Sequence, residues 1–243
     1  MEWVYGTNPV IEALRSGRDV SKVFLARQRV RGAREVIALA EVKGVPVSVR
    51  EDRFFEERFD KGHQGVAAVV ARKRLLTPEE ILGIPEERGE TPFYLVLDGL
   101  EDPRNFGAIL RVADAAGIHG VVLQGRRSVG VTPVVAKASA GAVEYVHIAE
   151  TVNIKHALRM FAEQGISIVG AEAGGAMSLW NADLKGPLAV VLGSEGQGLR
   201  RTVRDLCDSI VSLPMKGKVN SLNVSVACAV LAYEVLRQRT CLT

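Results

Sequence analysis

The sequence predicts an α/β protein of two domains, in which the larger, C-terminal domain has a mostly parallel sheet with helices on both faces. Three observations predict this class. Strand-like and helix-like segments alternate along most of the chain. The segment 93–97 is a continuous apolar run, as expected of a parallel strand that is buried on both faces. A stretch rich in proline and acidic residues, 74–92, separates two parts of different charge.

Composition excludes several classes of protein. The chain has 243 residues, of which 47% are hydrophobic, and a net charge of only +3, so disorder is not its dominant state. No apolar run approaches the roughly 18 residues that span a bilayer, and the first residues do not resemble a signal peptide. Three cysteines without Cys-x-x-Cys spacing disfavour a disulfide scaffold or a zinc site. We therefore expect no metal, no membrane partner and a reducing, cytoplasmic location.

Charge predicts where the domains divide. Residues 1–73 carry 14 Lys and Arg against 10 Asp and Glu, a net charge of +4. Residues 74–92 have a net charge of −3, and residues 93–243 have a net charge of +2. We predict a small basic domain over 1–73, a linker over 74–92 with a helical turn or two near 78–82, and a larger domain over 93–243.

The N-terminal domain combines helical and strand patterns. Helices are predicted from Asn8-Pro9 to Gly17 and over 33–43, and strands over 22–26, 45–49 and 66–71. A loop after the first of these strands carries four arginines with no acidic residue between them: Arg27, Arg29, Arg31 and Arg34. Arg binds phosphate oxygens through a planar fork, so this loop suits phosphate contact, although an ordinary solvated loop has a similar composition.

The C-terminal domain repeats strand, glycine-containing loop and helix. The predicted strands cover 93–97, 121–123, 167–169, 188–192 and 209–213, and the predicted helices cover 105–116, 133–141, 154–164, 199–206 and 223–237. Ligands of such sheets bind beyond the carboxyl ends of the strands, where this sequence has three polar loops.

The first polar loop leads into the helix 105–116. Asp102 is a good N-cap and Pro103 suits the first helical position. Arg111 stands among apolar neighbours, where a basic residue usually has a partner or a function. Asn105 and Arg111 are six residues apart, so on an ideal helix they do not form a tight pair.

The other two loops are rich in glycine and in capping residues. Loop 193–198 has Gly-x-x-Gly-x-Gly spacing, which is not the dinucleotide fingerprint, and its Glu195 needs an explanation. Segment 213–225 offers four possible caps for the next helix, namely Asn220, Ser221, Asn223 and Ser225, where one suffices. The excess hints at a binding site. The patterns alone thus predict an α/β ligand-binding domain joined to a small basic domain.

The segments 105–111, 193–199 and 213–225 resemble, in order, the three motifs of the TrmH-like branch of the SPOUT RNA methyltransferases. Tyr5-Gly6-x-x-x-Val10-x-x-Ala13-Leu14 and His63-Gln64-Gly65 also resemble the substrate domain of the bacterial 23S ribosomal RNA guanosine 2′-O-methyltransferases. The resemblance implies an α/β-knot catalytic domain with a deep trefoil knot, which binds S-adenosylmethionine (SAM). It also implies a homodimer whose active site is completed at the subunit interface, and an N-terminal RNA-binding fold of ribosomal-protein type.

The resemblance also assigns expected roles to residues of the three motifs. Gly193, Leu213 and Leu222 match positions whose loops hold the cofactor, and the matches to the family's active-site polar residues are Asn105, Arg111, Glu195, Ser221 and Asn223. The implied reaction is attack of a ribose 2′-hydroxyl oxygen on the methyl carbon of SAM. A guanidinium stays protonated, so we expect Arg111 to hold the phosphate or hydroxyl and stabilise negative charge instead of acting as a base. We expect Asn105 to position Arg111 or the RNA, and the other three to organise cofactor and ribose.

The expected substrate is a guanosine of 23S ribosomal RNA. With aromatic residues at only 5% of the chain, we expect the four arginines at 27–34, and not base stacking, to grip the RNA. Alternatives are methylation of transfer RNA, a non-catalytic RNA-binding protein that retains the fold, and a nucleotide-dependent oxidoreductase, which the glycine spacing disfavours. The motifs require no histidine, so we expect structural or surface roles for His119, His147 and His156.

Overall fold

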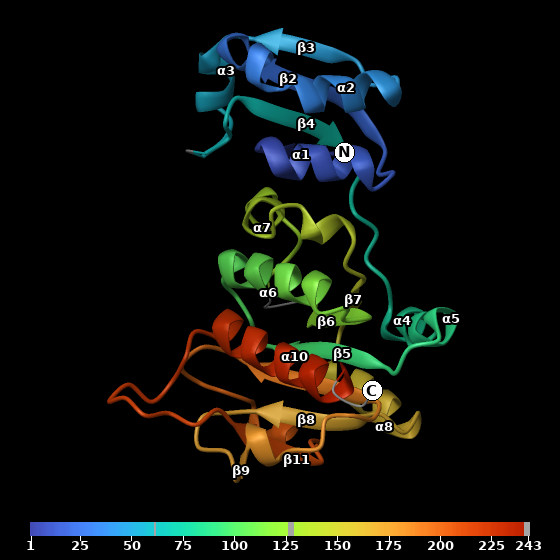
Figure 1. The fold of residues 1–243 in the computed structure, drawn as a ribbon, viewed down its shortest axis with the longest axis vertical. Helices are drawn as coiled ribbons and strands as arrows, with labels where there is room; N and C mark the ends of the chain where they lie inside the picture. The colour runs from blue at the N-terminus through green and yellow to red at the C-terminus, as the bar shows by residue number, and fades with distance from the viewer. Residues whose placement is uncertain (61, 126–128, 241–243) are drawn as a thin grey trace. The chain divides into compact units, whose positions relative to one another are not determined.

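The computed structural model describes residues 1–60, 62–125 and 129–240, and its chain divides into two compact units (Figure 1). The first unit comprises residues 1–74 and 131–145, and the second comprises 75–130 and 146–243. The chain therefore passes between the units three times. Composition predicts a single division around 74–92. In the structure, residues 75–92 group with the second unit, and 131–145 group with the first.

The first unit has a four-stranded sheet in the order β1 (Glu2–Tyr5), β4 (Val66–Val70), β2 (Val20–Ala26) and β3 (Val47–Arg50). Strand β4 is antiparallel to β1 and β2, whereas β3 is parallel to β2. Helix α1 (Thr7–Arg15) contacts α2 (Arg34–Val42), β1 and β4. These helices and three of the strands match the predicted segments, while β1 was not predicted.

Part of the core of this unit is an aromatic cluster. Tyr5, Phe24 and Phe55 are buried together, and Phe55 comes from the short helix α3 (Asp52–Glu56), which was not predicted. Segment 131–145 adds α7 (Pro133–Ala138) and the 3₁₀ helix η2 (Ala142–Glu144), which contact α1. The predicted helix 133–141 thus ends three residues early, and it belongs to the first unit.

The second unit is built on a seven-stranded parallel sheet. The strand order is β7 (Ile148–Thr151), β6 (Gly120–Gln124), β5 (Phe93–Asp98), β10 (Leu188–Gly193), β8 (Ser167–Ala171), β11 (Ser209–Ser212) and β9 (Met177–Ser178). Every strand pair in it is parallel. The predicted parallel α/β architecture is therefore confirmed. Strands β7 and β9, which are short, were not predicted.

Helices pack against this sheet in two groups. The short helices α4 (Pro78–Leu82), α5 (Ile84–Arg88) and α9 (Arg201–Arg204) and helix α8 (Ile154–Glu163) share one core, in which Tyr94 stacks on Phe161 with ring centroids 4.8 Å apart. Helices α6 (Pro103–Ala115) and α10 (Val224–Thr240) contact each other and strands β6 and β10. Ile81 of α4 is fully buried, so most of the stretch with linker-like composition is an integral part of this unit.

Topology marks one position at the carboxyl edge of the sheet. Strand β5 leads through α6 to its neighbour β6 on one side, whereas β10 leads through α9 to β11 on the other side. Because β5 and β10 are themselves paired, the connections diverge between them. In open parallel sheets, ligands bind at such a switch point. Two of the three polar loops follow these two strands.

Candidate active site

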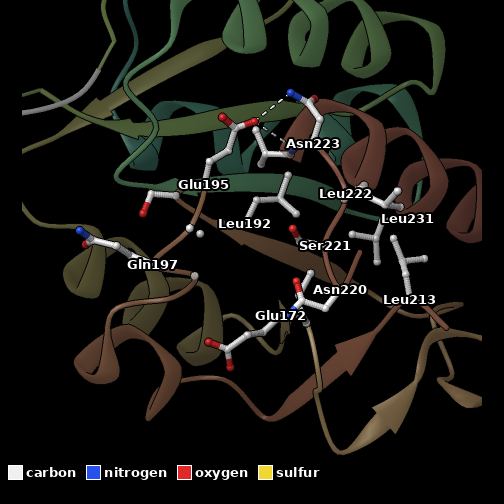
Figure 2. Close-up of a pocket in the computed structure, with 18 of the residues that line it drawn as sticks. Glu172, Leu192, Glu195, Gln197, Leu213, Asn220, Ser221, Leu222, Asn223 and Leu231 are labelled. Carbon is white, nitrogen blue, oxygen red and sulfur yellow. Dashed lines mark hydrogen bonds between the residues drawn. The ribbon is translucent and has the colours of Figure 1, made fainter. Parts of the chain in front are cut away.

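A cavity of about 550 Å³ lies at the carboxyl ends of β8, β10 and β11, a volume typical of small-molecule sites (Figure 2). Loop 193–198 forms one wall, and residues of segment 213–224 form another. The predicted cofactor residues Gly193, Leu213 and Leu222 all line this cavity, as do Glu195, Ser221 and Asn223. The structure thus brings two of the three polar loops to one site.

Gly193 is required by the loop that it begins. A Cβ at this position would lie 2.2 Å from the carbonyl carbon of Gly198. The loop folds back on itself because Ser194 N donates to Gly198 O at 3.2 Å, and Gly198 N donates to Ser194 O at 3.0 Å. Glycine at 193 therefore has a reason within the protein, in addition to the cofactor role that the motif resemblance implies.

A hydrogen-bonded cluster of Asn105, Glu195 and Asn223 stands beside the cavity (Figure 2 shows Glu195 and Asn223). Glu195 Oε1 accepts from Asn105 Nδ2 at 2.9 Å, from Asn223 Nδ2 at 2.8 Å and from Val224 N at 3.4 Å. Asn223 Nδ2 also donates to Asn105 Oδ1 at 2.9 Å. One residue from each of the three motifs therefore contributes to one cluster, and this explains Glu195 in the glycine loop.

Asn223 is also the residue that caps α10. Its Oδ1 accepts from Ser225 N at 2.9 Å and from Ser225 Oγ at 2.6 Å. The same side chain thus begins the helix with its oxygen and joins the cluster with its nitrogen. Asn105 is only 8% exposed, so the cluster has a buried side on α6.

Arg111 lies apart from this cluster. It is exposed on α6, is absent from the residues that line the cavity, and makes no hydrogen bond or ion pair with another described residue. Within one chain Asn105 does not contact Arg111, because six residues of helix turn the two side chains to different faces, and its expected role in positioning Arg111 or the RNA stays a prediction. Asn105 instead binds Glu195 and Asn223.

The sequence reasoning missed a buried carboxylate beside the site. Asp98, at the end of β5, has a fully buried side chain and accepts from Arg200 N at 2.9 Å and from Arg200 Nε at 2.6 Å. Arg200 Nη2 also donates to Gln124 Oε1, at the end of β6, at 2.9 Å. This network joins the ends of two strands to the segment that follows the glycine loop. Its only sequence signal is an acidic residue that ends an apolar strand.

Glu172 is a second missed residue, and it lines the cavity at the end of β8. Its Oε2 lies 3.4 Å from Arg204 Nε. Together with Glu195 it gives the cavity two carboxylates, and no Lys or Arg is among the described residues that line it. Such a lining favours a ligand with positive charge over nucleotides with several phosphates.

The four arginines predicted to bind RNA lie in the first unit, and all are exposed. Arg27, Arg29 and Arg31 belong to a 3₁₀ helix, η1 (Arg27–Gly32), in place of the expected loop, and Arg34 begins α2. Arg27 is paired with Glu51 at 3.1 Å, but both side chains are more than 70% exposed. The structure thus presents these guanidinium groups to solvent.

The His63-Gln64-Gly65 motif and the single residue His119 both have structural explanations. Gln64 Oε1 accepts from Thr7 N at 2.9 Å, which joins the His63-Gln64-Gly65 turn to the start of α1. His119 is buried, where its Nδ1 accepts from Phe93 N at 3.1 Å and its Nε2 lies 2.9 Å from Glu90 Oε2. Burial lowers the pKa of His119 from 6.5. These contacts give the 63–65 turn and His119 a role in the fold.

The described part of the chain contains neither a candidate metal site nor a candidate membrane span. No group of three or more His, Cys, Asp or Glu there could hold a metal ion. None of the helices in that part is long and apolar enough to cross a membrane.

Comparison with known families gives two matches that follow one another along the chain. Residues 92–233 match the SpoU rRNA Methylase family, and residues 3–76 match the RNA 2′-O ribose methyltransferase substrate binding family. These matches cover most of both parts predicted from the sequence.

Relatives match nearly the full length. A Bacillus subtilis protein assigned to the TrmH family of tRNA/rRNA methyltransferases, YacO, is 44% identical over 98% of this chain and 96% of its own. The 23S rRNA (guanosine-2′-O-)-methyltransferase RlmB of Yersinia pestis is 38% identical over 98% of both chains.

Solved structures of RNA methyltransferases also resemble this chain over most of its length. The SpoU methyltransferase AviRb from Streptomyces viridochromogenes, in complex with the cofactor AdoMet (SAM), superposes with a TM-score of 0.82 at 26% identity, covering 98% of this chain and 90% of that one. The AdoMet-bound rRNA methyltransferase from Sinorhizobium meliloti gives a TM-score of 0.79 at 25% identity over 97% of this chain and 87% of that one. The resemblance of the three motifs is therefore confirmed, and the chain belongs to the SpoU family of RNA methyltransferases.

Proposed function

We propose that this protein transfers the methyl group of SAM to the ribose 2′-hydroxyl of a guanosine in 23S ribosomal RNA. The observation that carries the proposal is the Asn105–Glu195–Asn223 cluster beside a cavity walled by a glycine loop. Relatives named for this reaction match the chain nearly end to end, whereas a TrmH/SpoU tRNA modifying enzyme from A. aeolicus matches 67% of it. The RlmB relatives support ribosomal RNA, and the full-length relative YacO, named for tRNA/rRNA methylation, is compatible with either RNA.

The residues of the cavity suit SAM. Its sulfonium and ammonium groups are positive, and the cavity offers Glu172 and Glu195 without a lining cation in the described chain. Leu213, Leu222 and Leu231 supply apolar surface, and Gly193 lets the backbone of loop 193–198 stay compact. Two solved relatives contain this cofactor. We therefore assign the cavity to SAM.

When bound, SAM supplies the reactive methyl group, so the protein needs to align the 2′-oxygen with it and stabilise the developing alkoxide. The bonds from Asn105 and Asn223 fix the carboxylate of Glu195, which holds the glycine loop to the starts of α6 and α10. Ser221 lines the cavity and offers a hydroxyl to the ribose. Arg111 supplies the positive charge for phosphate or alkoxide.

Arg111 reaches such a site if the protein is a homodimer. Helix α10 exposes Val226 and Tyr233, which are 48% and 51% exposed, and contacts α6, on which Arg111 is exposed. Exposed apolar side chains on one helix, and on the neighbouring helix an exposed arginine without a partner among the described residues, suit an interface between two copies. We propose that this α6–α10 face forms the dimer and that Arg111 completes the partner's site.

Complementation tests the dimer. Arg111→Ala is expected to lower the single-turnover rate about a hundredfold, because one contact to the transition state is lost. Glu195→Gln is expected to lower it by a similar factor, because the Asn105–Glu195–Asn223 cluster loses its carboxylate. If Arg111 serves the opposite site, co-refolded mixtures regain activity, because a mixed dimer has one site with both residues intact. Mixtures that stay as inactive as the two variants would contradict this arrangement, as would a monomer in sedimentation equilibrium.

The substrate is tested with methyl-labelled SAM and unmodified transcripts. We expect label in 23S RNA at a guanosine whose 3′ linkage resists alkaline hydrolysis, and none in transfer RNA. Label in transfer RNA alone would reassign the substrate, and binding of SAM and RNA without transfer would indicate a non-catalytic protein. We expect this reaction in the cytoplasm, where Cys207 and Cys228 stay reduced.

A further inference from the structure

The segment 131–145 lies in the sequence between β6 and β7 of the catalytic sheet, but it belongs to the first unit. We propose that this segment couples the RNA-binding unit to methyl transfer, and that Glu144 is a positioning residue which acts through Arg18. The proposal rests on the function proposed above. It adds a second part of the chain to the substrate-binding domain, whose family match covers only residues 3–76.

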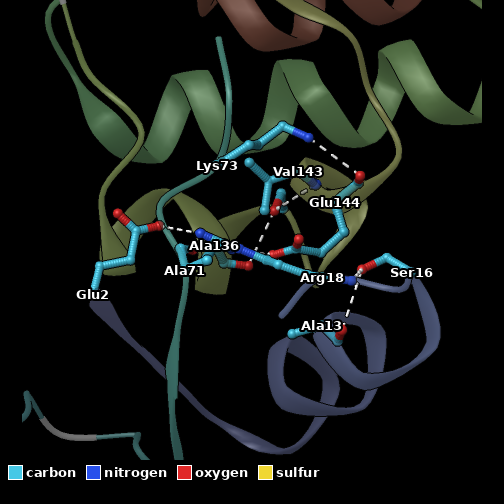
Figure 3. Close-up of polar contacts among 10 residues, drawn as sticks. Glu2, Ala13, Ser16, Arg18, Ala71, Lys73, Ala136, Val143 and Glu144 are labelled. Atoms are coloured by element: carbon cyan, nitrogen blue, oxygen red, sulfur yellow. Dashed lines mark hydrogen bonds and ion pairs between the residues drawn. The ribbon is translucent and has the colours of Figure 1, made fainter. Parts of the chain in front are cut away.

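One guanidinium holds three chain segments together in this unit (Figure 3). Arg18 Nε donates to Ala71 O at 2.8 Å, and Nη1 donates to Glu144 Oε1 at 2.6 Å. Its Nη2 donates to Glu2 Oε1. Lys73 Nζ donates to the carbonyl oxygen of Glu144 at 3.2 Å. The cluster thus joins β1, the end of β4 and η2.

The ion pair between Arg18 and Glu144 is buried. The side chains of Arg18 and Glu144 are 8% and 3% exposed. Burial raises the pKa of the Glu144 carboxyl, and the charge of Arg18 opposes that shift. A buried ion pair persists where geometry and extra hydrogen bonds compensate for lost hydration, as they do here, and removal of one partner leaves an uncompensated charge.

Contacts of the same segment with α1 fix its position further. A Cβ on Gly141, whose φ is +96°, would lie 2.5 Å from Glu12 Cγ. Tyr145 OH donates to Glu12 Oε2 at 2.6 Å. The segment therefore fits closely on the unit that carries the four exposed arginines.

The two ends of the segment are covalently joined to the catalytic sheet. The segment begins at residue 131, after the carboxyl end of β6. At that end of β6, Gln124 accepts a hydrogen bond from Arg200, which also binds Asp98. Residue 145 precedes β7. If the segment leaves the first unit, two of the three chain connections between the units lose their anchor there. RNA held by the exposed arginines would then still bind, but its 2′-hydroxyl would be poorly aligned.

The variant Glu144→Gln keeps the shape of the side chain and removes the charge. We expect faster amide hydrogen exchange in 131–145, RNA and SAM dissociation constants within about threefold of wild type, and a single-turnover rate at saturating RNA lowered about tenfold, as misalignment costs. Glu57→Gln is the control, because it breaks an exposed ion pair with Arg53 in the same unit. It should change none of these quantities.

A second variant separates coupling from folding. The triple variant Glu2→Gln, Arg18→Met and Glu144→Leu removes the guanidinium together with both carboxylates that it pairs with, so neither carboxylate is left without its partner. The segment should then stay protected, and the rate should recover to within threefold of wild type. The proposal is overturned if Glu144→Gln exchanges faster in 131–145 yet transfers methyl at the normal rate. It is equally overturned if RNA affinity falls by the same factor as the rate, because the cluster then only maintains the fold. Wild-type protein without any transfer would refute the proposed function instead.

Discussion

Asn105 Nδ2 donates to Glu195 Oε1 over 2.9 Å, although the two residues are 90 positions apart in the sequence. The bond joins the first turns of α6 to the glycine loop after β10, at the point where the connections of the sheet diverge. Asn223 bonds to both residues and thereby adds the start of α10. We infer that this cluster fixes the positions of the segments that line the cavity.

Replacing Asn105 by Asp tests the cluster. The new carboxylate would face that of Glu195 at hydrogen-bond distance and could not donate to it, so we expect a loss of about 1–3 kcal/mol in the free energy of unfolding. We also expect the transfer rate to fall at least tenfold. Urea unfolding and single-turnover assays measure the two effects. Asn153→Asp is the matched control, because Asn153 caps α8 through its oxygen, and aspartate caps equally well. Equal behaviour of the two variants would count against the cluster.

Replacing Gly193 by Ala tests the glycine loop. A Cβ would lie 2.2 Å from backbone that cannot yield without opening the loop. We expect SAM affinity, measured by calorimetry, to weaken at least tenfold. Gly186→Ala should leave affinity unchanged, since a Cβ there meets nothing within 4 Å. A Gly193→Ala protein that binds SAM normally would show that loop 193–198 does not shape the cofactor site.

These two sites show what the sequence could and could not predict. Strand β5 and helix α6 carry local signals, an apolar run and the pair Asp102-Pro103, and both form where predicted. The cofactor cavity follows from loops at the ends of parallel strands. The partners of Glu195 come from distant segments, so the reason for its place in the loop was visible only in the fold.

The division into units was harder to predict for the same physical reason. Composition marks 74–92 as a linker, but Ile81 completes the core of the second unit. Glu144 belongs to the first unit through Arg18, which is 126 positions away. Strands as short as β1 and β9 take their stability from pairing with neighbours, so their own residues give little signal.

His119 makes stability depend on pH. Burial lowers its pKa in the folded state below 6.5, so on acidification the unfolded chain binds a proton first. Stability is therefore complete above about pH 7 and declines as pH falls through 6.5 toward the folded-state pKa. Thermal unfolding between pH 5 and 8 measures this, and His119→Asn should flatten that part of the profile. Replacing the exposed His156 by Asn is the control and should leave the profile unchanged. If the His119→Asn variant showed the same profile as the wild type, His119 would not be the cause of the pH dependence.

The arginine-rich 3₁₀ helix is expected to contact RNA phosphates. Changing Arg27, Arg29, Arg31 and Arg34 to Gln should weaken RNA binding and reduce the slope of log K against log salt by up to about 3.6, since each phosphate contact contributes about 0.7–0.9. SAM affinity should not change, because these residues lie in the other unit from the cavity. An unchanged salt slope in filter-binding titrations would place the RNA elsewhere on the protein.

A map of ribose 2′-O-methylation in RNA from cells with and without this protein tests most directly whether it methylates 23S ribosomal RNA. We expect one guanosine of 23S ribosomal RNA to lose its methyl group in the deletion strain, and to regain it when the wild-type chain, but not the Asn105→Asp variant, is restored. Identical maps of ribosomal RNA from the two strains would contradict this expectation.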